Sequence, residues 1–301
     1  MKPGTNKSWP KQFLLIALVG LLLQPAFKAQ SQNFVLKNTE TVQLKNELTG
    51  RDHELIIFLP DSYNHSKSKK YPVFYFLDGY WHMPLLYSIY GNLRYDNVIP
   101  EMIMVGLSYP GENVNYDSLR MRDLTPTKWY EFNQNTGDGP GFLQFIEKSV
   151  IPTIESNYRA DKSIRALGGQ SAGGLFSLYA MYSKPELFKR YIAISPAAMW
   201  GQNYLFLTDS AYSKLTNELP VRLFLSAGGD EYPAFRAPII RLQKQIESHH
   251  YQNFSLLNYV IEGERHTGVA AEGYTRGLRW IFKDMAPTGP SGLAKAFGVT
   301  E

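Results

Sequence analysis

Short apolar runs alternate with amphipathic segments along most of the chain. The continuous apolar runs at residues 73–77 and within residues 99–108 are typical of strands that are buried on both faces. Further strand patterns lie at residues 34–44, 53–60, 164–167, 191–195, 221–226 and 256–261, and helix-spaced apolar positions lie at residues 142–158, 237–250 and 271–285. This alternation predicts one α/β domain with a mostly parallel sheet and helices on both of its faces.

The first 29 residues have the pattern of a secretory signal. Lysines precede an unbroken apolar run at residues 13–23, and small residues follow as far as Ala29. The run is shorter than the ~20 residues that a membrane span needs, so we expect cleavage near Ala29 and export to the periplasm or the medium of a bacterium. An uncleaved N-terminal anchor is the alternative. After cleavage we expect no stable membrane insertion, a single domain over residues 30–285 and a frayed tail over residues 286–301.

Composition and charge exclude several classes of function. The chain has no cysteine, which excludes disulfides, zinc–thiolate sites and a thiol nucleophile. Of its 31 Lys and Arg residues, four lie in the first 29 residues, which hold no Asp or Glu. The remaining 27 basic residues balance 27 acidic residues, so the charge gives no support for a nucleic-acid partner.

The segment GGQSAGG at residues 168–174 indicates the clearest chemistry. Gly169, Ser171 and Gly173 form a G-x-S-x-G pattern between a strand pattern and a helix pattern. Very small residues on either side allow a sharp turn that presents a serine hydroxyl, which is called a nucleophile elbow. The N-terminus of the following helix directs free N–H groups toward that serine. The motif therefore predicts a nucleophile at Ser171.

Such a serine needs a histidine and a carboxylate, and both occur later in the chain. The strand pattern at residues 221–226 is followed by Asp230 and Glu231, and the last strand pattern is followed by His266 on a glycine-containing loop. Functional groups of a parallel sheet gather at the carboxyl ends of its strands, and the order serine, acid, histidine is typical of such sites. We predict His266 as the general base and Glu231 as its acid partner, with Asp230 as the alternative acid.

Backbone N–H groups are expected to stabilise the oxyanion of the reaction. Ala172, the residue after the nucleophile, should supply one of these groups, and Gly79 or Tyr80, after the third predicted strand, should supply the other. The neighbouring Trp81 and His82 are candidates for the wall of the substrate pocket. Packing in the core is the alternative for the aromatic residues of this segment.

Several further segments accompany the elbow. In chain order they are LPDSY at 59–63, YPV at 71–73, LDG at 77–79, RMRDLTP at 120–126, GFL at 141–143, ISP at 194–196 with Trp200, and GE-x-H at 263–266. In this series the chain resembles the putative-esterase family of α/β-hydrolases, which includes enterochelin esterases and bacterial carbohydrate esterases. The resemblance covers about residues 51–283 and is far more specific than the elbow alone.

The resemblance implies an α/β-hydrolase fold and a serine carboxylic-ester hydrolase that acts on a small-molecule ester without a metal or an organic cofactor. By this resemblance Ser171 and His266 carry over directly, and Glu231 aligns with the acid position of the family. The loop around Met199 and Trp200 is implied to shape the pocket.

Two arginines in the RMRDLTP segment have two interpretations. Arg120 or Arg122 is a candidate for contact with an acidic or phenolic substrate. A structural salt bridge to Asp123 or to another nearby acid is the favoured alternative.

Other functions use the same groups. An acyltransferase or a serine peptidase is the main alternative, because either would employ the same triad. A non-catalytic binding protein on this fold is less favoured, because both Ser171 and His266 are present, although a fold alone does not establish an activity. Siderophore, acetylated-sugar and feruloyl esters all remain open as substrates, as does the oligomeric state.

Overall fold

An eight-stranded sheet runs through the part of the chain that the computed structural model describes, which is residue 4 and residues 34–132 and 134–299. The strands are β1 (Thr39–Asn46), β2 (Arg51–Phe58), β3 (Tyr71–Phe76), β4 (Ile103–Ser108), β5 (Ala160–Gln170), β6 (Arg190–Ile194), β7 (Arg222–Gly228) and β8 (Ser255–Ile261). Their order across the sheet is β1-β2-β4-β3-β5-β6-β7-β8. The pairs β1–β2 and β2–β4 are antiparallel and all others are parallel, which confirms the expected α/β fold.

The burial of apolar side chains distinguishes the central strands from the edge strands. Every residue of β3 and β4 is buried, as a strand covered on both faces requires, whereas β1 and β8 at the two edges are partly exposed. Because β3 and β5 to β8 are all parallel, their carboxyl ends lie at the same end of the strands. The residues that follow these strands are therefore brought together.

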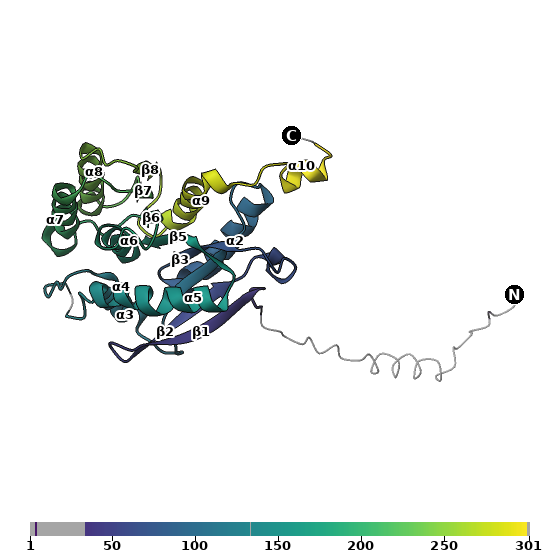
Figure 1. Ribbon diagram of the computed structural model, residues 1–301, viewed down its shortest axis with the longest axis horizontal. Helices are drawn as coiled ribbons and strands as arrows, with labels where there is room; N and C mark the ends of the chain where they lie inside the picture. Colours follow the sequence, from purple (N-terminus) through teal and green to yellow (C-terminus); the bar gives the residue numbers. More distant parts are fainter. Residues whose placement is uncertain (1–3, 5–33, 133, 300–301) are drawn as a thin grey trace. The chain divides into compact units, whose positions relative to one another are not determined.

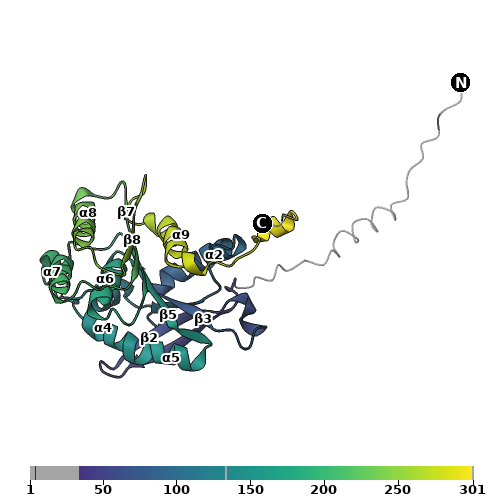
Figure 2. The same ribbon diagram turned by 45° about the horizontal axis from the view of Figure 1, so that its top comes forward.

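Helices cover both faces of the sheet (Figures 1 and 2). On one face, α2 (Gly79–Tyr95) and α9 (Val269–Ile281) pack against each other. The other face is covered by α4 (Gly139–Phe145), α5 (Ile151–Asn157), α6 (Ala172–Ser183), α7 (Trp200–Leu215) and α8 (Pro233–Ser248). The buried apolar residues accordingly form two clusters, one on each side of the sheet. Within the described ranges, none of the helices combines the length and the apolar character that crossing a bilayer requires.

Several helices differ from the pattern-based expectation. The helix expected at residues 142–158 is divided into α4, a π-helical turn (Ile146–Val150) and α5. Pro152 has no N–H to donate to the preceding turn, and the N–H of Ile151 bonds to the carbonyl of Ile146, five residues earlier. In addition, α3 (Tyr116–Leu124) lies in a stretch without apolar periodicity, where the Asn115 side chain caps the helix by accepting from the N–H of Ser118 at 3.0 Å.

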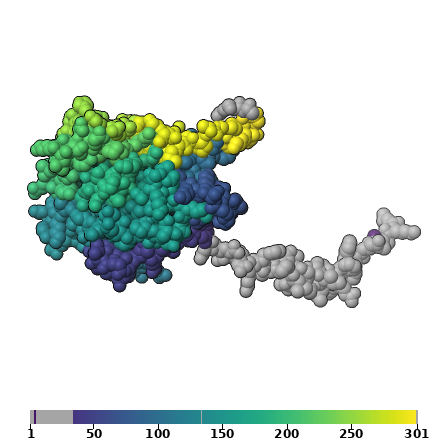
Figure 3. Space-filling view, viewed as in Figure 1, coloured from purple at the N-terminus to yellow at the C-terminus, as the bar shows by residue number. Residues whose placement is uncertain are grey.

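The C-terminal segment is ordered where a frayed tail was expected. It forms the short helix α10 (Gly292–Ala296), which begins with a hydrogen bond from the N–H of Ala294 to the hydroxyl of Ser291. Asn97, just beyond α2, donates to the carbonyl of Pro290 at 2.7 Å. Figures 1 and 3 show these yellow C-terminal residues next to the blue residues of α2. These contacts connect the start of α10 to the end of α2.

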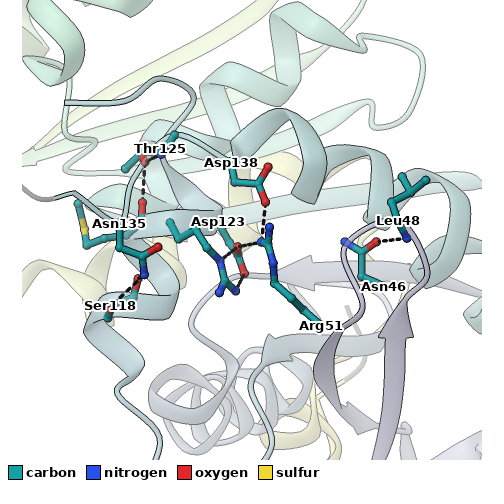
Figure 4. Close-up of polar contacts among 11 residues, drawn as sticks. Asn46, Leu48, Arg51, Ser118, Asp123, Thr125, Asn135 and Asp138 are labelled. Atoms are coloured by element: carbon teal, nitrogen blue, oxygen red, sulfur yellow. Dashed lines mark hydrogen bonds and ion pairs between the residues drawn. The ribbon is translucent and has the colours of Figure 1, made fainter. Parts of the chain in front are cut away.

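A partly buried charge cluster ties α3 and α4 to the sheet (Figure 4). Arg51, on β2, contacts the carboxylates of Asp123 at 3.2 Å and Asp138 at 2.5 Å. Arg122 forms a bidentate pair with Asp123, with N–O distances of 2.6 and 3.0 Å. These contacts close the loop between α3 and α4, because Asp123 lies before the loop and Asp138 lies after it.

His53, on β2, is expected to make stability depend on pH. Its side chain is 2% exposed and stacks on Phe145 with ring centroids 4.5 Å apart, and burial lowers its pKa to about 4. As the pH falls, the unfolded chain therefore binds a proton at His53 from about pH 6.5, whereas the folded chain binds it only near pH 4. The free energy of unfolding falls between these two pH values. This group accounts for about 3 kcal/mol of that fall.

The substitution His53→Phe should remove this part of the pH dependence, because phenylalanine keeps the ring and cannot titrate. Denaturant unfolding at pH 7 and pH 4.5 measures the change. The exposed His65 offers a matched control, since His65→Phe should leave the pH dependence as it is. An unaltered pH dependence in the His53→Phe variant would contradict the assignment.

Candidate active site

Ser171 lies at a sharp bend between β5 and α6. Its backbone has φ 58° and ψ −117°, a region that costs a non-glycine residue about 1–3 kcal/mol. The bend closes only because its neighbours lack side chains: a Cβ at Gly169 would lie 2.5 Å from the carbonyl carbon of Gly173. The N–H of Ser171 donates to the carbonyl of Ile194 at 2.9 Å, which fixes the bend to the end of β6. The predicted elbow geometry is therefore present.

Glu231 and His266 form a short contact at the ends of β7 and β8. The Nδ1 atom of His266 lies 2.6 Å from Oε1 of Glu231, whose side chain is buried. The second oxygen, Oε2, accepts hydrogen bonds from Ser195 Oγ at 2.8 Å and from the N–H of Gly228 at 3.0 Å. Burial by itself would raise the pKa of Glu231, but the hydrogen bonds from His266, Ser195 and Gly228 outweigh it and lower the pKa. Glu231 is thus held as a carboxylate against the imidazole.

Asp230 occupies a different environment from its neighbour. The residue is exposed, and its backbone N–H donates to the carbonyl of Glu264 at 3.0 Å. The two loops pack closely here, because a Cβ at Gly228 would lie 2.4 Å from the same carbonyl oxygen. This packing turns Glu231 inward to His266 and leaves Asp230 at the surface.

The loop that carries His266 adjoins the elbow. The Gln170 side chain, directly before Ser171, donates to the carbonyl oxygen of His266. Phe235 of α8 packs edge-on against the His266 ring, with centroids 4.3 Å apart. A cavity of about 310 Å³ opens beside the histidine, and Tyr232 and Arg265 line it. The fold therefore brings the histidine loop next to the serine turn, and an accessible cavity lies beside the histidine loop.

The three expected oxyanion donors lie at two helix N-termini. Ala172 is the first residue of α6, and Gly79 and Tyr80 are the first two residues of α2, so their N–H groups have no acceptor within their helices. A Cβ at Gly173 would lie 3.3 Å from the Leu77 side chain, which places the end of β3 against the elbow. The N-terminus of α6 therefore lies close to the end of β3, from which the chain leads into α2.

Four of the six candidate pocket residues form polar contacts with other parts of the protein: His82, Arg120, Arg122 and Trp200. His82 and Trp200 are buried, at 8% and 3% exposure, so their side chains present little surface to a ligand in this structure. The Nδ1 atom of His82 lies within hydrogen-bonding distance of the Leu77 carbonyl and the Tyr274 hydroxyl, and the indole of Trp200 donates to the Thr127 carbonyl.

Both arginines belong to ion pairs, which is the structural alternative stated above. Arg120 binds Asp78 with two hydrogen bonds of 2.7 and 2.8 Å, and Arg122 binds Asp123. Trp81, in contrast, is 46% exposed. Met199 is partly buried against the core.

Sequence reasoning missed three residues that hold this site: Gln170, Ser195 and Phe235. In the sequence, Ser195 only ends a strand pattern. The structure gives it φ 40° and directs its hydroxyl to Glu231, which no local pattern predicts. Phe235 resembles any apolar helix residue.

Across the described residues, no three His, Asp or Glu side chains are close enough to hold one metal ion.

Comparison with known sequences finds one protein family and several related esterases. The model of the family described as Putative esterase matches residues 46–254, more than half of the chain. The chain is 29% identical over 212 residues to the ferri-bacillibactin esterase BesA of Bacillus subtilis, covering 66% of this chain and 72% of that protein. It is 28% identical over 208 residues to the siderophore triacetylfusarinine C esterase of Aspergillus fumigatus, covering 60% and 71% respectively.

Solved structures show the same fold. The BES protein from Bacillus cereus superposes with a TM-score of 0.77 at 25% identity, covering 84% of this chain and 98% of that chain. An IroE-like serine hydrolase from Shewanella oneidensis gives a TM-score of 0.74 at 26% identity, covering 83% and 81%. The chain therefore belongs to the Putative esterase family of α/β-hydrolases, and it is a carboxylic ester hydrolase.

Proposed function

We propose that this esterase acts through a catalytic triad of Ser171, His266 and Glu231. The observation that carries the proposal is the 2.6 Å contact between His266 Nδ1 and Glu231 Oε1, on loops that meet the elbow. Because Nδ1 faces the carboxylate, Nε2 is the ring nitrogen left to accept the proton of the Ser171 hydroxyl. The carboxylate fixes this tautomer and stabilises the imidazolium that forms.

The proposed reaction has two halves. In the first, Nε2 of His266 removes the proton of Ser171 Oγ as this oxygen bonds to the ester carbonyl carbon. The N–H groups of Ala172 and of Gly79 or Tyr80 stabilise the resulting oxyanion. The carbon–oxygen bond to the alcohol then breaks, the alcohol takes the proton from His266, and the acyl group stays on the serine. In the second half, water replaces the alcohol in the same steps and releases the carboxylic acid.

We propose a siderophore ester with aromatic groups as the substrate. The relatives named above are esterases of ferri-bacillibactin and of the siderophore triacetylfusarinine C, which supports the siderophore class. In this chain, Tyr80 and Trp81 are 57% and 46% exposed beside the proposed oxyanion donors, and Tyr80 stacks on Tyr116 with centroids 5.0 Å apart. Exposed rings of this kind bind aromatic groups by stacking.

A panel of catecholate-siderophore, feruloyl and acetylated-sugar esters tests this proposal. The kcat/KM should be highest for the siderophore ester, by about tenfold or more, which corresponds to about 1.4 kcal/mol of transition-state binding. A higher kcat/KM for the acetylated sugar would overturn the substrate assignment. Product analysis in the presence of an added alcohol separates hydrolysis from acyl transfer, since a transferase would form a new ester.

We also propose that residues 1–29 direct export and are removed. The support is the basic and apolar pattern of this segment, with the small residues Ala26 and Ala29 near its end. N-terminal sequencing of protein recovered outside the cytoplasm should show a chain that starts near Gln30. A chain that still starts at Met1 would instead support the uncleaved anchor.

A further inference from the structure

A polar contact connects the backbone of His266 to the residue before the nucleophile. Gln170 is the last residue of β5, and its amide nitrogen donates to the carbonyl oxygen of His266. A single side chain therefore touches the histidine loop while its own backbone leads directly into Ser171. The reaction steps above assign no role to Gln170.

Behind Gln170 lies a buried histidine that the reaction does not use. The ring of His82 lies beside the Gln170 side chain. Its Nδ1 atom lies 3.1 Å from the carbonyl oxygen of Leu77 and 3.0 Å from the hydroxyl of Tyr274, a fully buried residue of α9. These two contacts join the end of β3 with α2 and α9.

The tautomer of His82 follows from these contacts. A carbonyl oxygen only accepts hydrogen bonds, so Nδ1 carries the proton and donates to Leu77. Burial lowers the pKa of His82, which keeps the ring neutral and leaves Nε2 as an acceptor.

We propose that Gln170 is a positioning residue that holds the His266 loop against the serine turn. Glu231 fixes the imidazole from one side, and Gln170 fixes the backbone of the same residue from the other. The loop needs such a contact, because residues 262–268 are largely exposed and include Gly263 and Gly268. This inference rests on the proposed role of His266 as the general base.

The substitution Gln170→Met tests the inference, because methionine keeps the length of the side chain and removes both N–H donors. The kcat for 4-nitrophenyl acetate should fall by about 10- to 100-fold, the range that a small displacement of a catalytic group produces. KM should stay within about twofold, since the side chain is not proposed to touch the substrate. Gln243→Met, the same change on α8, should leave both constants unchanged. An unchanged kcat in Gln170→Met would overturn the proposal.

A double-mutant cycle separates positioning from a general structural effect. In a His266→Ala background, Gln170→Met should change the small residual rate by no more than about twofold, because the base that it positions is gone. If the residual rate falls again by the full factor, Gln170 acts on the elbow itself and the proposal is wrong.

A second readout does not depend on ester hydrolysis. Hydrogen exchange followed by mass spectrometry should show faster exchange in residues 262–268 of Gln170→Met, with no change in the buried strand β3. Unchanged exchange in that loop would overturn the positioning role even in an active enzyme. An inactive wild-type enzyme that nevertheless shows the loop effect would instead refute the proposed triad and leave the loop contact intact.

Discussion

Replacing Ser171 by alanine is expected to lower kcat for 4-nitrophenyl acetate by at least about three orders of magnitude. The reason is that the elbow presents this hydroxyl at the N-terminus of α6, where the loop of His266 adjoins it. Without Oγ no acyl-enzyme forms, and only the rate that the oxyanion donors give to direct attack by water remains. Steady-state rates at saturating substrate measure the effect.

Ser177→Ala is the matched control for this experiment. Ser177 lies on the same helix, is fully buried, and donates its hydroxyl to the Gly173 carbonyl at 2.9 Å. Its loss should cost about 1 kcal/mol of stability and leave kcat within about twofold. If Ser171→Ala kept most of the wild-type activity, the nucleophile would have to be another residue.

The second large effect is expected at the acid. Glu231→Gln should lower kcat by about two to four orders of magnitude, because an amide no longer stabilises the imidazolium and permits the wrong histidine tautomer. The change also disturbs the hydrogen bonds from Ser195 and Gly228, so thermal unfolding must show that the variant is folded at the assay temperature.

Asp230→Asn provides the comparison for Glu231→Gln, since it makes the same chemical change one residue away at an exposed position. Its kcat should remain within about twofold of the wild-type value, as is usual for surface substitutions. The reverse ranking of the two variants would assign the acid role to Asp230.

The features that the sequence predicts best depend on residues that are close together along the chain. Consecutive apolar residues predicted the buried strands β3 and β4, and the spacing of Gly169, Ser171 and Gly173 predicted the bend. Each follows from a local requirement, namely burial on both faces of a strand or room for a tight turn. Such requirements hold whatever the rest of the chain does.

Contacts between distant residues explain what the sequence could not predict. Asp230 and Glu231 are adjacent, and only the packing of Gly228 against the Glu264 carbonyl turns one inward and the other to the surface. In the sequence, His82 lies shortly after the third predicted strand, next to the expected oxyanion donors. Its hydrogen-bond partner in the core is Tyr274, which is 192 residues away.

The same holds for the candidate substrate arginine Arg120. Its partner is Asp78, 42 residues earlier, which has φ 56° at the start of α2. An arginine that binds both oxygens of a carboxylate has fewer donors for a substrate anion, and only the folded chain shows that this pair exists.

The central claim is that Ser171 is activated by His266, and covalent labelling tests it most directly. Brief treatment with a fluorophosphonate, followed by intact-mass measurement and peptide mapping, should show one adduct on Ser171. The adduct should be absent in Ser171→Ala and should form at least about a hundredfold more slowly in His266→Ala. A wild-type adduct on any other residue, or an equal labelling rate without His266, would contradict the account.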